Sequence, residues 1–107
     1  MNKEVFLEML AKEEFPLPIY VVREGGSFLD LHAHPYEVRA LVTEGQIDIV
    51  INAIRSTYLA GDCFHLASNQ PHTESYGGKG VKYLASRKGL VLQSELGFEQ
   101  REDLEVM

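Results

Sequence analysis

Between residues 19 and 88 the sequence is divided by turn-forming residues into short runs of β-branched and aromatic residues. The runs include IYVVRE, SFLDLH, VRALVTE, STYLAG and VKYLASRK, and the turns between them include Gly25-Gly26, Glu44-Gly45 and Gly77-Gly78. Runs that recur roughly every eight to twelve residues, without helix-length segments between them, favour antiparallel strands in a sandwich or barrel. Alternation within residues 46–51 gives one clearly buried face, formed by Ile47, Ile49 and Ile51. We therefore predict an all-β fold.

The two ends of the chain differ from this strand-rich centre. Apolar residues spaced by three and four positions predict a short amphipathic helix over residues 3–14, with Asn2 as its cap and Pro16 as a stop. This helix is expected to cover one open end of the core, and the alternative is an arm exchanged with a partner chain. We divide the 107 residues into a lead-in (1–18), one barrel domain (19–88) and an extension on the same domain (89–107).

Charge and cysteine content exclude several classes of protein. Sixteen acidic residues against ten basic ones give a formal charge of −6, which argues against nucleic acid as a partner. No apolar run reaches the roughly 18 residues of a membrane helix, and the start of the chain lacks a secretory signal pattern. The single cysteine, Cys63, fits a reducing compartment, so a cytoplasmic protein is expected. A domain of this size buries a limited core, so we also expect a homodimer.

The histidines are the residues that point to chemistry. His32 and His34 are two positions apart, so on a strand their side chains point the same way and form half of a metal coordination sphere. His72 lies forty residues after His32. His65 lies between Phe64 and Leu66, which share a face, so His65 should point away from it.

Two stretches around these histidines resemble the two motifs of the cupin superfamily. The first runs from Gly26 through His32-Ala-His34 to Gly45, and the second runs from Gly61 to Pro71-His72. The hairpin between them, residues 46–60, has the length typical of compact bacterial cupins, and the resemblance covers about residues 19–88. It implies an antiparallel jelly-roll barrel that holds a divalent transition metal (Fe, Mn, Ni or Zn). The histidines that match the ligands of the family are His32, His34 and His72.

The fourth ligand of the family is a glutamate, and here the sequence departs from the pattern. Val38 stands at the matching position, and Glu37 stands one residue earlier. Strict alternation from His34 puts Tyr36 on the histidine side and Glu37 on the opposite side. Pro35 favours a bulge, which would reset this alternation and turn Glu37 inward. The sequence leaves both arrangements open.

We select Glu37 and Tyr36 as candidate catalytic residues: Glu37 as a fourth ligand or acid/base group, and Tyr36 as part of the pocket wall. If Glu37 points outward, an ion pair with Arg39 is expected instead.

The sequence supports three functional hypotheses. The first is a small metal-dependent enzyme, with oxygenase-type (dioxygenase-like) or isomerase-type chemistry on a small-molecule substrate. The second is a non-catalytic sensor or binding module for a small molecule. The third is a barrel in which the metal only stabilises the fold. The fold does not distinguish them, because function depends on the site.

Overall fold

The computed structural model of the protein describes residues 1–89, which form one helix and six strands. The elements are α1 (Lys3–Lys12), β1 (Ile19–Arg23), β2 (Phe28–His32), β3 (Glu37–Ile51), β4 (Ile54–Leu59), β5 (Cys63–Leu66) and β6 (His72–Lys88). All strand pairs among them are antiparallel. The predicted extension, from residue 90 onward, lies outside the described residues.

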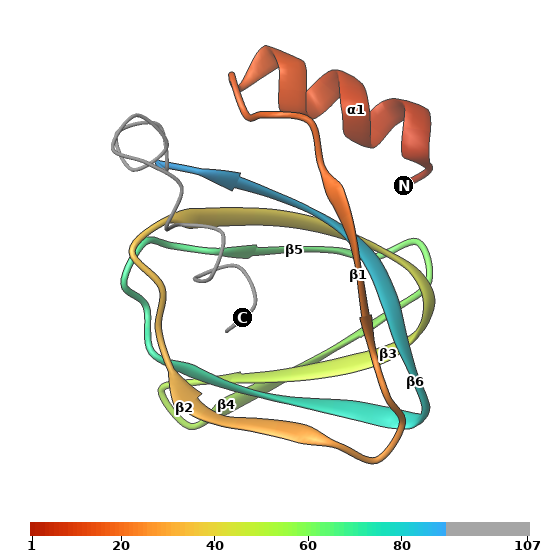
Figure 1. The fold of residues 1–107 in the computed structure, drawn as a ribbon, viewed down its shortest axis with the longest axis vertical. Helices are drawn as coiled ribbons and strands as arrows, with labels where there is room; N and C mark the ends of the chain where they lie inside the picture. Colours follow the sequence, from red (N-terminus) through yellow and green to blue (C-terminus); the bar gives the residue numbers. More distant parts are fainter. Residues whose placement is uncertain (90–107) are drawn as a thin grey trace.

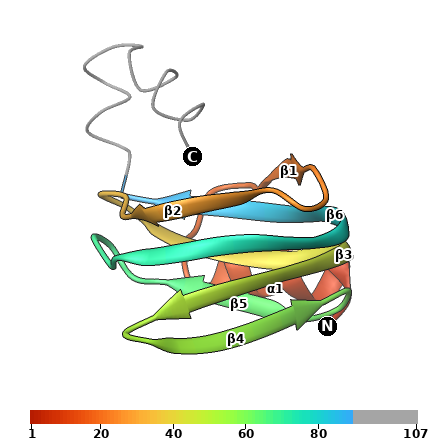
Figure 2. The same cartoon turned by 90° about the horizontal axis from the view of Figure 1, so that it is seen from below.

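Two long strands organise the barrel. β3 and β6 pair with each other from Glu37↔Lys88 to Val50↔Thr73, along almost their whole length. β1 and β5 flank the half of this ribbon that contains the beginning of β3, and β2 and β4 flank the other half. The ribbon bends in its middle, so the two halves become two facing layers (Figures 1 and 2). This arrangement confirms the predicted antiparallel jelly-roll barrel with a short N-terminal helix.

The bend depends on glycines whose backbones touch. The register of β3 against β6 shifts on both sides of the bend, between Val42 and Glu44 and between Gly45 and Ile47. Gly45 has φ of +79°, and a Cβ atom placed on it would lie 2.0 Å from the carbonyl oxygen of Gly80. Gly80 has φ of +82°, and its own Cβ would lie 2.4 Å from the carbonyl oxygen of Arg23. Only glycine permits this approach in this conformation.

The helix lies on the outside of one layer, as Figure 1 shows. The Asn2 side chain accepts a hydrogen bond from the Val5 amide at 2.9 Å, as the sequence predicts for its cap. The helix buries Phe6 and Leu10 in a small cluster with Phe15, Leu41 and Leu84. Leu41 and Leu84 point outward from their strands, because their sequence neighbours belong to the interior cluster. The expectation that the helix covers an open end of the core is therefore corrected: it covers the outer face of a layer.

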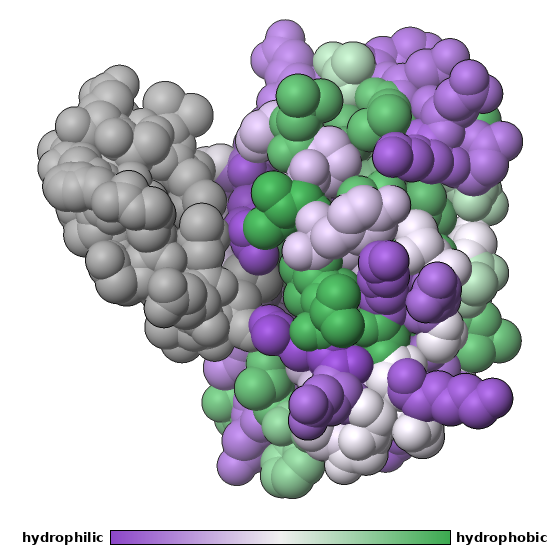
Figure 3. Space-filling view, turned by 45° about the vertical axis from the view of Figure 1, so that its right-hand side comes forward, coloured by the Kyte–Doolittle hydropathy of each residue, from purple (hydrophilic) through white to green (hydrophobic). Residues whose placement is uncertain are grey.

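An exposed apolar strip follows β1. Leu17, Ile19, Tyr20 and Val22 are each about half exposed or more. In Figure 3 hydrophobic residues in green gather over the middle of the visible face, with hydrophilic residues in purple around them. Among the described strands β1 pairs only with β6, so it forms an edge of the sheet. The homodimer stays a prediction, for which this edge is a suitable surface.

None of the helices in the described part of the chain is both long enough and apolar enough to span a membrane.

The glycine contact gives a test of the fold. We expect Gly45→Ala to lower the free energy of unfolding by about 3 kcal/mol or more, because the added methyl group meets backbone that cannot move independently. Gly26→Ala is the matched control, since Gly26 also has positive φ, +78°, but nothing lies within 4 Å of its added Cβ. It should lose only about 1 to 2 kcal/mol from the backbone conformation. Equal losses in urea denaturation of the two variants would contradict the role of the contact.

Candidate metal centre

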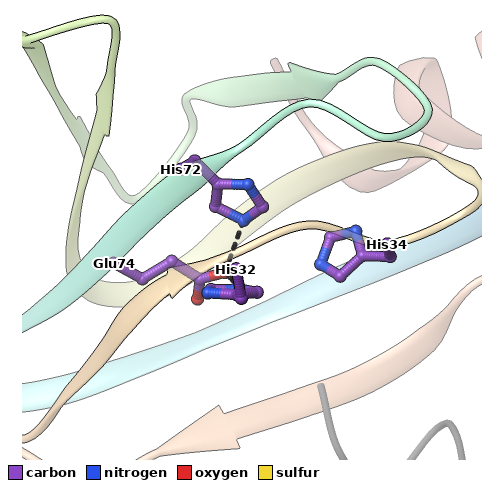
Figure 4. Close-up of side chains that lie close together, drawn as sticks. All are labelled: His32, His34, His72 and Glu74. Carbon is purple, nitrogen blue, oxygen red and sulfur yellow. Dashed lines mark hydrogen bonds and ion pairs between the residues drawn. The ribbon is translucent and has the colours of Figure 1, made fainter.

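Four side chains from two adjacent segments meet inside one end of the barrel (Figure 4). His32 is the last residue of β2, and its Cα lies opposite that of His72, the first residue of β6. His34 lies in the connection between β2 and β3, and Glu74 follows His72 by two residues on β6. One potential ligand atom from each lies within 4.8 Å of all the others. We call this set, His32, His34, His72 and Glu74, the histidine–glutamate cluster.

The Glu74 carboxylate lies between two of the imidazoles. Its Oε2 atom is 3.1 Å from His72 Nε2 and 3.2 Å from His32 Nε2. Only the His72 contact has the geometry of a hydrogen bond. The other oxygen, Oε1, accepts a hydrogen bond of 2.9 Å from the Tyr76 hydroxyl. Tyr76 thus holds one oxygen and leaves the second directed at the histidines.

Backbone carbonyls orient two of the rings from behind. His72 Nδ1 lies 2.9 Å from the Gln70 carbonyl oxygen, and His32 Nδ1 lies 2.6 Å from the Asp30 carbonyl oxygen. Because a carbonyl oxygen can only accept, each Nδ1 carries the hydrogen, and Nε2 of the neutral ring is the atom with a lone pair. This is the arrangement by which metal-binding histidines are fixed in ring orientation and tautomer.

Two buried nitrogens in the cluster have no hydrogen-bond partner: Nε2 of His32 and Nε2 of His34. Buried polar atoms without partners carry a free-energy cost of about 1 to 3 kcal/mol each, so such atoms call for an explanation. A cation between the rings would satisfy both lone pairs and the Glu74 carboxylate together. Three imidazole nitrogens and one carboxylate oxygen suit a divalent transition metal better than calcium or magnesium, which prefer oxygen ligands.

The pKa shifts favour a neutral His34 ring and a charged Glu74 carboxylate, and they favour a proton on His72. Burial, reinforced by His72 and His32, lowers the pKa of His34 to about 4, so His34 is neutral near pH 7. Burial favours the neutral form of Glu74, but hydrogen bonds from His72 and Tyr76 outweigh it and lower the pKa of the carboxyl. Burial disfavours the charged form of His72, yet its hydrogen bond with Glu74 outweighs this and raises its pKa. In the absence of a metal, a proton on His72 therefore balances the charge of Glu74.

The structure does not bring Glu37 into the cluster. Tyr36 and Val38 are buried in the interior cluster, and between them Glu37 points to the outer face, where its carboxylate contacts His65 Nε2. Pro35 therefore does not reset the alternation. An ion pair between Glu37 and Arg39 was expected for an outward Glu37. Arg39 instead pairs with Glu13, whose carboxylate oxygen lies 3.2 Å from Arg39 Nε. His65 points away from the histidines, as its position on the strand predicts.

Tyr36 lies against the cluster, although it is not part of it. Its ring is stacked on His34, with centroids 4.8 Å apart and planes 6° from parallel. It thus forms part of the wall beside the candidate metal centre.

The carboxylate that the sequence reasoning missed is Glu74. The rule that brought His32 and His34 together, two positions on one strand face, also applies to His72-Thr73-Glu74. That signal was present in the sequence. The first motif of the resembling family places its glutamate near Glu37, and that spacing points away from Glu74.

Comparisons with known proteins identify the fold. No family model and no curated protein matches the chain. Among solved structures, it is similar to an RmlC-like cupin from Shewanella frigidimarina (18% identity, 67% of this chain and 65% of that one, TM-score 0.57). It is also similar to the Cnp3 cupin domain of Schizosaccharomyces pombe, with 13% identity over 71% of this chain and 57% of that one and a TM-score of 0.61. A third match is the DMSP lyase DddQ from Ruegeria pomeroyi, with 20% identity over 65% of this chain and 36% of that one and a TM-score of 0.60.

In each of these matches the chain spans less than two thirds of the solved structure, and at such identities the likeness concerns the fold alone. The bent ribbon of β3 and β6 and the matches agree with the two motifs read from the sequence. The chain has the fold of the RmlC-like cupins.

Proposed function

We propose that the protein binds one divalent transition-metal ion through His32, His34, His72 and Glu74, and that it acts as a small metal-dependent enzyme. The observation that carries the metal site is the pair of buried, unpartnered Nε2 atoms beside the ionised Glu74 carboxylate. The candidate ions are Fe, Mn, Ni and Zn, since affinity order alone does not select among them. A cytoplasmic location stays a prediction.

A bound metal would supply Lewis acidity, activation of water or reaction with dioxygen, which are the requirements of isomerase-type and oxygenase-type chemistry. Other residues of the chain orient the proposed ligands or form the wall of the pocket. His32 and His72 are held by the carbonyls of Asp30 and Gln70, and Tyr76 fixes the orientation of Glu74. Tyr36 forms a wall of the pocket beside His34.

An ionised carboxylate only 5% exposed supports an enzyme over a purely structural metal site. Burying such a group has a free-energy cost, and buried groups with shifted pKa values concentrate at sites of chemistry. The second candidate, a sensor that binds a small molecule without converting it, would use the same residues.

Metal content tests the site. We expect protein purified without added metal to contain about one transition-metal ion per chain, as a mononuclear site requires, and His34→Ala to contain almost none. Glu74→Gln should lose most of the metal, because the amide lacks the charge of the carboxylate. Glu37→Gln is the matched control and should retain the parental content, since Glu37 pairs with His65 on the outer face. Elemental analysis by mass spectrometry measures all four proteins. Parental metal content in His34→Ala would refute the proposed site.

Tyr76→Phe probes the support behind the ligands. The substitution keeps all four proposed donors and removes the hydroxyl that holds Glu74 Oε1. Loss of such a supporting hydrogen bond is expected to weaken metal affinity by about tenfold or more. Competition with a zinc-sensitive chelating dye gives the affinity. An unchanged affinity would mean that Glu74 is positioned by the cluster alone.

Turnover separates the two candidate functions. Metal-loaded protein would be incubated in air with a panel of small organic acids and sugars, with oxygen consumption and product masses recorded. The enzyme hypothesis predicts conversion that Glu74→Gln abolishes and Glu37→Gln preserves. Ligand-dependent stabilisation without conversion of any ligand would favour the sensor.

A further inference from the structure

Strand β1 has one edge that pairs with no strand in residues 1–89. Its other edge is paired with β6, in a register from Ile19↔Ala85 to Arg23↔Val81. The backbone N–H and C=O groups on an unpaired edge can add a further strand, and natural edges prevent this with charged residues, proline or bulges. Residues 19–22 of β1 are all apolar or aromatic. In this part of the chain the edge is therefore suited to the addition of a strand.

The side chains along this edge form an exposed apolar surface. It consists of Leu17, Ile19, Tyr20 and Val22, which are each about half exposed or more, and we call it the β1 strip. Tyr20 and Val22 point outward from the barrel, because Val21 between them is buried in the interior cluster. A contiguous apolar surface of this kind marks a site of interaction, whereas scattered single residues do not.

Two lysines lie against the β1 strip. Nζ of Lys82 is 5.0 Å from the centroid of the Tyr20 ring, and Nζ of Lys3 is 5.9 Å from it. Lys82 is also the Cα partner of Val22 in the pairing of β1 with β6. The chain has a formal charge of −6, so two copies repel each other on average, and cations around the strip reduce this repulsion locally.

An open hollow of about 500 Å³ begins where the strip ends. Val22 lines it on β1, Gly45 and Gly80 line it at the bend, and Lys79 and Lys82 line it on β6. The hollow thus lies beside the last residues of β1. A strand added antiparallel to β1 would have its first residues at this place.

We propose that the β1 strip binds the β1 strip of a second copy of the chain, with the two β1 strands antiparallel and a two-fold axis at Val21. This register places Tyr20 opposite Val22 of the other copy, twice, and aromatic and β-branched residues are favourable cross-strand neighbours. An axis at Val22 would instead place Tyr20 opposite Glu24. An axis at Tyr20 would place Val22 opposite Pro18, which has no N–H to donate.

The same register brings the other features of the edge into contact. Because Lys82 lies beside Val22, it approaches the Tyr20 ring of the other copy as well as its own, which adds a cation–π contact between the copies. Leu17 precedes β1 and is 86% exposed, and the register carries it to the hollow of the other copy. None of these residues belongs to the histidine–glutamate cluster, so the proposal does not rest on the metal site.

Sedimentation velocity of the full chain over a range of concentrations tests the proposal. We expect the mass to rise from that of one chain to that of two, without larger species, because a two-fold contact of one surface with itself is closed. A five-residue strand is small beside a standard interface of about 20 to 30 residues a side. The dissociation constant is therefore expected in the range of about 1 to 100 μM.

Val22→Lys should raise this dissociation constant at least about tenfold, since lysine on an edge strand opposes pairing. Ile54→Lys is the matched control and should associate like the parent. Val22 and Ile54 are 65% and 69% exposed, both lie on strands, and both substitutions add one positive charge.

Crosslinking tests the register. In a Cys63→Ser background, Tyr20→Cys protein and Val22→Cys protein are mixed and treated with a short bifunctional thiol reagent. The mixture should form covalent dimers at least about fivefold faster than either protein alone, because only unlike positions lie directly opposite each other. Equal rates in the three samples would contradict an axis at Val21.

Several results would overturn the proposal: a parent that stays monomeric, parental association in Val22→Lys, or a loss of association in Ile54→Lys. A monomeric parent whose melting temperature falls in Val22→Lys and not in Ile54→Lys would assign the strip to a contact within the same chain. A monomeric parent with equal melting temperatures in both variants would leave the strip to a different protein.

Discussion

The close backbone contact between Gly45 and Gly80 is the constraint on which the arrangement of the site depends. It lies where the paired strands β3 and β6 bend, and the carbonyl oxygen of Gly80 occupies the place of a Cβ on Gly45. The bend has a direct consequence for β6. Fifteen residue steps separate His72 from Arg87, and a straight strand of that length would hold them roughly 50 Å apart. The fold instead carries both ends of β6 to one side of the barrel, as Figure 1 shows.

Much of this arrangement follows from patterns that can be recognised in the sequence. The strand rhythm and the glycine turns predict the barrel, and the two histidine stretches predict which residues meet inside it. The helix was also predictable from its spacing, but its position was not. Phe6 and Leu10 require an apolar surface, and the sequence does not show that the outward residues Leu41 and Leu84 provide one. Which outer face is covered depends on pairings between distant strands, which local patterns do not contain.

The carboxylate illustrates a different limit. Alternation from Tyr36 to Val38 places Glu37 outside, and the same alternation from His72 places Glu74 inside. The expectation for Glu37 came from the spacing in a resembling family, and it competed with the simpler rule of strand geometry. The structure follows the simpler rule at both positions. Where a motif departs from its pattern by one residue on a strand, the shifted residue faces the other side of the sheet.

The charge balance inside the barrel connects the fold with the proposed chemistry. Glu74 is buried and ionised, and in the absence of a metal its charge is balanced by a proton on His72. A metal ion would replace that proton, because Nδ1 of His72 already donates to the Gln70 carbonyl and leaves Nε2 to bind. The Glu74 carboxylate would then be a ligand of that ion, together with the three imidazoles. The first residues of β6 supply both His72 and Glu74, so one strand contributes a nitrogen donor and an oxygen donor to the same site.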